Sequence, residues 1–250
     1  AFFEIAVENP TDAWLDYAIA ATLNNPLPSN NINRYSRTYR AHWIHMSSDG
    51  VDPDALEYGT LTLATGALST DPCDDDAACG DFATIPPEDI GYQEYWFRGR
   101  WFDSLQVYWR ELTTPGNLHN RCYPLLESGH DNPATLAVRV HVAPGATGKV
   151  RFVLAWCFPN RTNDWNPHAA DRAQQAGIRN QWRNYYSFLF KDSEAAARYA
   201  LGYWDDLYGK PRQFQQALFS SDLPPAALDA VSANLAVLKS PTVMRLADGT

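Results

Sequence analysis

The stretch "VRFVLAWCFPNRTNDW", residues 150–165, begins as a β-strand and ends in a polar run. Apolar side chains occupy alternate positions of its first half: Val150, Phe152, Leu154 and Trp156. This period of two predicts a strand with a heavily apolar inner face. Pro159 ends the strand because it has no N–H to donate, and the polar residues 160–164 follow. The polar run indicates either the surface end of a buried strand or a loop directed at a polar ligand.

The same alternation recurs in four other segments, at residues 3–7, 15–23, 59–68 and 134–142. The turn "ENPTD" after the first segment predicts an antiparallel hairpin between the first two strands. The turn "APGATG" predicts a second hairpin over residues 134–158. Antiparallel strand pairs joined by short turns, without an alternation of strands and helices, predict a β-sandwich.

Helical patterns appear once inside the strand-rich part and again after it. The segment "WFDSLQVYWREL" has apolar residues at helical spacing and predicts a short amphipathic helix packed across the sandwich. Asp192 is the expected N-cap of a helix that Gly209 ends, and "PRQFQQALFSS" continues as a second helical piece. A third helix around residues 222–240 has an apolar seam that needs a partner. The sequence therefore starts a helical layer after its strands.

Composition excludes several classes of function. The 250 residues carry a formal net charge of −9, which repels the phosphate backbone of a nucleic acid. The longest apolar runs fall well short of the ~20 residues that a membrane span needs. The aromatic content of 13% is high, and aromatic rings both fill cores and stack on the apolar faces of sugars.

The cysteines give no clear chemistry. Cys122 and Cys157 are expected to be buried apolar residues, and whether Cys73 and Cys79 in "CDDDAAC" form a disulfide stays open. The chain lacks the spacing of a zinc finger or an EF-hand. Asn160-Arg161-Thr162 is formally a glycosylation sequon.

Three segments of the second half resemble glycoside hydrolase family 116. They are "FVLAWCFPNR", "RNYYSFLFKDSEAAARYALGYWDDL" and "LFSSDLPPAALDAVSANLAVLKSPTVMRLADGT". The resemblance covers essentially the whole chain and is most specific over residues 150–250. The family includes non-lysosomal glucosylceramidases and bacterial β-glucosidases.

The resemblance implies a particular domain organisation. Residues 1–158 would form an N-terminal antiparallel β-sandwich, and residues 159–190 a polar interdomain linker. Residues 191–250 would be the first helices of an incomplete (α/α)6 barrel, the catalytic domain.

The activity implied is retaining hydrolysis of β-glucosides or glucosylceramide. Two carboxylates roughly 5 Å apart would act as nucleophile and general acid/base. By resemblance both lie beyond Thr250, so no catalytic residue is assigned and this chain alone is expected to be inactive. The mechanism needs no metal or other cofactor, and the partner of the sandwich is the helical catalytic domain of the same chain.

The resemblance places the polar run after Pro159 where the barrel would sit. Asn160, Arg161, Asp164 and Trp165 are therefore candidates for the interdomain contact or for the rim of the sugar site. The interdomain role is favoured because buried Arg and Asn side chains more often satisfy backbone groups than touch substrate.

Two other functions stay open. The chain could be a non-catalytic carbohydrate-binding or structural module that uses exposed Trp and Tyr as sugar platforms. It could also be a Cys–His hydrolase, with Cys122 and His119 or Cys157 and His168. The compartment is open, with the cytoplasm slightly favoured because no signal peptide is visible; the first residues read as the middle of a strand, as in a truncated chain. Neither the aglycone nor the oligomeric state is predicted.

Overall fold

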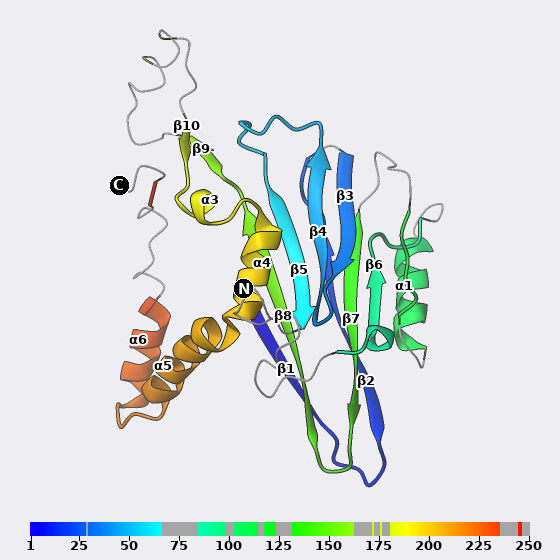
Figure 1. Cartoon of the computed structure of the whole chain (residues 1–250). Coiled ribbons are helices and arrows are strands. Elements are labelled where there is room, and N and C mark those ends of the chain that lie inside the picture. The colour runs from blue at the N-terminus through cyan, green and yellow to red at the C-terminus, as the bar shows by residue number, and fades with distance from the viewer. Residues whose placement is uncertain are drawn as a thin grey trace.

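Strand β8 (Thr147–Cys157) lies in the larger of two antiparallel sheets that face each other (Figure 1). The computed structural model describes residues 1–28, 30–66, 85–98, 103–114, 118–123, 132–162, 172, 176, 181–235 and 245–246. The larger sheet has five strands, in the order β1 (Phe2–Glu8), β8, β5 (Thr60–Gly66), β4 (Ala41–Asp49) and β3 (Asn30–Arg37). The smaller has three, in the order β2 (Leu15–Asn24), β7 (Pro133–Val142) and β6 (Ile90–Gln93). The expected antiparallel, β-rich architecture followed by helices is confirmed.

The main core lies between the two sheets. The five-stranded sheet contributes buried apolar side chains such as Ile44, Leu63 and Phe152, and the three-stranded sheet contributes Leu136 and Val138. Burying this apolar surface provides most of the favourable free energy of folding.

Strand β8 is covered on both faces over much of its length. Val150 and Phe152 point into the core between the sheets, whereas Val153 and Ala155 pack beneath a helix on the outer face. Trp156 was expected on the inner face, but its side chain is 54% exposed at the end of the strand. The period of two therefore identifies the core residues of β8 except at this end.

Both predicted hairpins are wrong. β1 pairs with β8 in one sheet and β2 pairs with β7 in the other, so each turn carries the chain from one sheet to the opposite one. The two turns lie side by side: Asn9 N–H donates to the Ala146 carbonyl at 2.9 Å, and Gly145 N–H to the Asn9 carbonyl at 2.8 Å. Alternation along a strand reports which side chains share a face, but not which strand lies beside it.

A helix covers the outer face of each sheet. Helix α1 (Asp103–Thr113) is the predicted amphipathic helix; its Tyr108 and Leu112 pack against the three-stranded sheet near Ala20 and Ala137. Helix α4 (Ser193–Gly202) lies over the five-stranded sheet (Figure 1). The Asp192 side chain accepts a hydrogen bond from Ala195 N–H at 2.8 Å and is the N-cap of α4, as predicted.

Gly209 does not end the helix as expected. The chain continues through a π-helical turn, Asp205–Gly209, directly into α5 (Lys210–Phe219). Pro211 explains the wider turn, because in a regular α-helix its ring would clash with the carbonyl of the residue four positions earlier. Helix α6 (Pro225–Asn234) follows, and neither α5 nor α6 buries any of its residues. Figure 1 shows both helices lying away from the two sheets.

Between β8 and α4 the described residues of the predicted linker include three short elements. They are β9 (Asn160–Thr162), β10 (Gln181–Arg183) and α3 (Tyr186–Leu189). Strands β9 and β10 form a small antiparallel sheet of their own. A 3-10 turn, Pro87–Asp89, precedes β6.

Candidate functional site

The end of β8 is held by the segment that follows β10. Phe158 N–H donates to the Tyr186 hydroxyl at 3.0 Å, and that hydroxyl donates back to the Phe158 carbonyl. The Asn184 side chain donates to the same carbonyl at 3.0 Å, and its backbone N–H donates to the Pro159 carbonyl at 2.9 Å. Burial raises the pKa of Tyr186 above its ordinary value, which is already high enough for the hydroxyl to stay protonated at neutral pH. The chain therefore leaves β8 in a defined direction.

Asn160 fixes the loop between β4 and β5. Its side chain is 8% exposed, and its amide nitrogen donates to the Pro53 carbonyl at 2.7 Å and the Ala55 carbonyl at 2.8 Å. The loop also closes on itself, because Asp54 N–H donates to an Asp52 carboxylate oxygen at 3.0 Å. Both hydrogens of the Asn160 amide are thus in use, and the nitrogen that a glycan would modify is enclosed in the folded chain.

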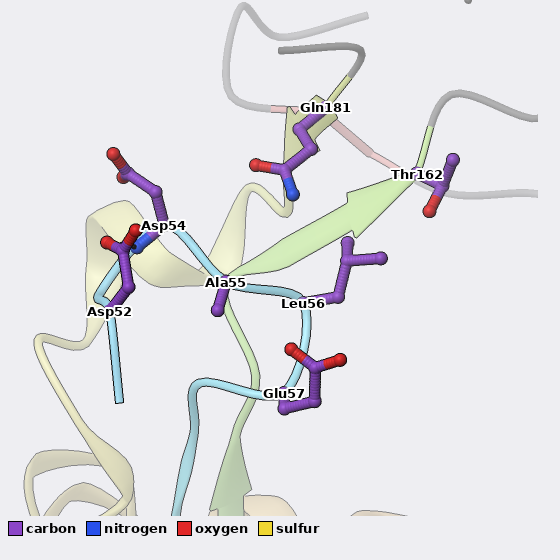
Figure 2. A pocket seen from close by; sticks show the side chains of 7 residues that line it. All are labelled: Asp52, Asp54, Ala55, Leu56, Glu57, Thr162 and Gln181. Atoms are coloured by element: carbon purple, nitrogen blue, oxygen red, sulfur yellow. Dashed lines mark hydrogen bonds between the residues drawn. The ribbon is translucent and has the colours of Figure 1, made fainter. Parts of the chain in front are cut away.

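An open cavity of about 490 Å³ lies between this loop and the β9–β10 sheet. Its described lining combines acidic, polar and apolar side chains: Asp52, Asp54, Ala55, Leu56, Glu57, Thr162 and Gln181. Figure 2 shows Asp52 and Asp54 on one side of the loop and Leu56 and Glu57 on the other, with the Gln181 side chain extending from β10 above them. We call this feature the loop cavity.

The lining of the loop cavity suits hydroxyl groups better than anions. Carboxylate oxygens accept hydrogen bonds, the Gln181 amide can donate and accept, and the Thr162 hydroxyl can do both. Leu56 and Ala55 add an apolar surface. The described lining holds three carboxylates and no basic side chain, so an anionic ligand would meet repulsion there.

Of the candidate residues in the polar run, the two that the structure describes, Asn160 and Arg161, are not among the described lining of this cavity. Asn160 is buried beneath the loop, and Arg161 is partly buried on β9 opposite Trp182. Asp164 and Trp165 lie outside the described residues. Thr162 belongs to the polar run that the sequence indicated, although it was not among the candidate residues; Gln181 and the three acidic residues of the loop were not singled out. The Asp- and Gly-rich segment "DGVDPDALEYG" between two strands was the available signal.

The cysteines do not form a nucleophile in the described residues. Cys157 is buried, and burial raises the pKa of its thiol, which opposes formation of the thiolate that attacks a substrate. Cys122 is an exposed free thiol, so the prediction that it is a buried apolar residue is wrong, whereas that for Cys157 is confirmed. His168, Cys73 and Cys79 lie outside the described residues. His, Cys, Asp and Glu side chains do not gather, in the part of the chain that is described, into a group of three or more that could hold a metal ion.

Five large aromatic side chains of the described residues are exposed on the two sheets, their loops and α1. They are Phe3 on β1, Trp14 before β2, Tyr39 between β3 and β4, Trp109 on α1 and Trp156 on β8. Each could stack on a sugar ring, but they come from five different segments of the chain. Among the described helices, none is long and apolar enough to cross a membrane.

Comparison with known families gives one match that covers most of the chain. Residues 1–207 match the model described as beta-glucosidase 2, glycosyl-hydrolase family 116 N-term. A search of curated proteins finds none that matches. The family model includes both sheets, the loop cavity and α4.

Proposed function

The chain belongs to glycoside hydrolase family 116, and from this we propose that it forms the N-terminal part of a retaining glycosidase. The family match over residues 1–207 is the observation that carries the proposal. The substrate class would be β-linked glucosides, with glucosylceramide as one candidate. The (α/α)6 catalytic domain would begin with the helices after residue 190.

The exposed surface of α5 and α6 supports a helical partner. Phe214 and Phe219 on α5, and Val231 on α6, expose much of their side chains to solvent. A helix that leaves such residues uncovered gains free energy when another apolar layer covers them. We propose that further helices of the barrel are that layer.

The catalytic carboxylates are proposed to lie beyond Thr250. Retaining hydrolysis needs a nucleophile and a general acid/base about 5 Å apart, one on each side of the scissile bond. The acidic residues of the loop cavity are not assigned either role. They would instead meet sugar or aglycone hydroxyls at the edge of the site.

Hydrolysis of p-nitrophenyl β-glucoside and of glucosylceramide tests the proposal. The natural protein is expected to release glucose with retention at the anomeric carbon, and residues 1–250 alone are expected to release none. Release of glucose with inversion by the natural protein, or activity of residues 1–250, would contradict it.

Arg161, Asp164 and Trp165 are proposed to contact the catalytic domain. Asn160 was a candidate for the same contact, but its side-chain amide bonds two backbone carbonyls of the β4–β5 loop, so its role is structural within the sandwich. Replacing Arg161 with alanine in the natural protein should lower the melting temperature and leave KM for the glucoside unchanged. An unchanged melting temperature with a raised KM would place Arg161 at the rim of the sugar site.

The non-catalytic alternative rests on the exposed aromatic residues. Binding of residues 1–250 to a soluble β-glucan, measured by calorimetry and lost in the Trp109→Ala and Trp156→Ala variants, would favour a carbohydrate-binding module. Absence of binding would leave the glycosidase proposal as the account of this chain.

A further inference from the structure

Four charged side chains connect the π-helical turn and α5 to the sandwich. Glu4 of β1 accepts a hydrogen bond from Arg212 of α5, with Oε1 and Nη1 2.9 Å apart. Arg151 of β8 lies opposite Glu4 in the sheet, with its Nε 3.5 Å from Oε2. Arg151 also reaches Asp205 at 3.7 Å, at the first residue of the turn. The chain of contacts Asp205–Arg151–Glu4–Arg212 therefore bridges the π-helical segment. It runs from the first residue of that segment to the beginning of α5.

Glu4 is placed to hold a cation from the helix. Its side chain is 9% exposed and meets Arg212, Arg151 and, at 4.0 Å, Lys149. A carboxylate removed from water to this degree is stable when cations surround it, and its attraction to them is stronger than at the open surface. The aromatic rings beside it add to the effect: the Arg151 guanidinium lies 4.7 Å from the Trp204 ring centroid, and that of Arg212 5.9 Å from the Tyr208 ring.

Apolar burial does not hold α5 and α6 in place. Neither helix has a buried residue, in contrast to α4, where Ala197, Ala200 and Leu201 are buried against the sheet. The helical segment ceases to bury side chains at the π-helical turn, where the backbone departs from regular α-helix geometry. The direction in which α5 leaves the sandwich therefore depends on contacts near this turn. Tyr208 of the turn packs against Phe2 and Trp204, and Asp205 and Arg212 add charged contacts to the sandwich.

We propose that Glu4 and Arg212, with Arg151 and Asp205, form a latch that fixes the angle between α5–α6 and the sandwich. The π-helical turn is the hinge that the latch closes. The latch would set how the apolar face of α5–α6 is presented relative to the loop cavity. It depends only on residues 1–250, so it can be tested without any glycosidase activity.

Pulsed electron paramagnetic resonance on residues 1–250 measures the angle as a distance distribution. Spin labels attached to p-acetylphenylalanine at the exposed positions Asp12 and Asp229 report on the sandwich and α6, and the natural cysteines stay in place. Arg212→Gln removes the cation and keeps a side chain of similar length. Lys210→Gln is the matched control, because Lys210 pairs with Asp206 at 3.0 Å within the helical segment itself.

The unsubstituted chain and Lys210→Gln are expected to give the same narrow distribution. Arg212→Gln should broaden it, with a roughly two- to five-fold fall in the ratio of latched to unlatched molecules, as expected for loss of one partly exposed ion pair. Glu4→Gln should broaden it further, because Arg212, Arg151 and Lys149 would then repel one another. A distribution in Arg212→Gln that is identical to that of Lys210→Gln would overturn the proposal.

Salt provides a second test, made on the unsubstituted chain. Raising NaCl to about 1 M shortens the screening length to about 3 Å, which acts most on the exposed Asp205 and least on the pairs of the nearly buried Glu4. The unsubstituted chain should therefore broaden less than Arg212→Gln, with its circular dichroism unchanged. Broadening in salt equal to or greater than that in Arg212→Gln would show that the pairs of Glu4 do not hold the angle.

Discussion

The side chain of Asn160 joins two segments that lie more than a hundred residues apart in the chain. Its amide donates to the carbonyls of Pro53 and Ala55, and the Ala55 carbonyl also accepts from Tyr58 N–H at 3.2 Å. A buried carbonyl that loses its hydrogen bond costs about 1–3 kcal/mol. The shape of the loop cavity therefore depends on this one residue.

Replacing Asn160 with aspartate should destabilise the chain by about 2 kcal/mol or more, because a carboxylate would face two carbonyl oxygens. Urea unfolding at neutral pH measures the change. Asn24→Asp is the control, since Asn24 is exposed at the end of β2. Equal free energies of unfolding for the two variants would show that Asn160 does not hold the loop.

His42 makes the stability of the sandwich depend on pH. Its side chain is fully buried, and its Nδ1 lies 2.7 Å from the Tyr35 hydroxyl. Burial is the main reason that the pKa of His42 falls from 6.5 to about 4, and the nearby positive charge of Arg37 lowers it further. A hydrogen bond with the Ile85 backbone acts in the opposite direction and raises this pKa. Between these two values the unfolded chain binds more protons than the folded chain, so the free energy of unfolding rises with pH across that window.

His42→Gln should flatten this dependence. The contribution lost between pH 6.5 and 4 is at most about 3 kcal/mol. Burial lowers the pKa of His45 and acts in the same direction, whereas bonds to Asp16 and Asp89 raise the pKa of His141 and act in the opposite one. Urea unfolding at several pH values measures the slope, and equal slopes in both proteins would contradict the assignment to His42.

Strand β3 shows how side chains close the edge of a sheet. Asn33 N–H donates to the Tyr95 hydroxyl at 2.9 Å, and Tyr35 N–H donates to the Glu94 carboxylate at 2.9 Å. Both acceptors follow β6 of the opposite sheet, so the two sheets are joined at this edge. An edge strand with free N–H groups can pair with another chain, and these contacts block that pairing.

Tyr95→Phe removes one of these acceptors without changing the volume of the core. It should cost about 1–3 kcal/mol, because the Asn33 N–H stays buried and loses its partner. Thermal unfolding with Tyr39→Phe as control measures this, since Tyr39 is exposed. A Tyr95→Phe variant as stable as Tyr39→Phe would show that the edge is closed by other contacts.

At the scale of whole elements, the sequence indicated which segments form strands and helices, but not which strands pair with one another. Alternation located β5, β7 and β8, and helical spacing located α1 and α4. The partner of each strand was not predictable, because a short turn can return to the same sheet or cross to the other. The turn at Asn9 crosses because its side chain bonds the Val142 carbonyl at 2.9 Å.

In the whole molecule, the loop cavity joins a loop near residue 55 with strands after residue 159. No local pattern links such distant segments, and their proximity follows from the pairing of β4, β5 and β8. The polar run after Pro159 was visible in the sequence. Only the structure shows that its first residue supports the loop between β4 and β5. Sequence patterns did not indicate Arg212, and they indicated Asn160 as a candidate without identifying its partners, because both residues act through tertiary contacts.

The proposed role of the chain as the front part of a retaining glycosidase is tested most directly by trapping the intermediate. The natural protein should be treated with a 2-deoxy-2-fluoro-β-glucoside, which traps the covalent glycosyl-enzyme, and the labelled peptide identified by mass spectrometry. We expect one labelled carboxylate, in a peptide that follows Thr250. A label within residues 1–250, or a natural protein that hydrolyses β-glucosides with inversion and takes up no label, would contradict it.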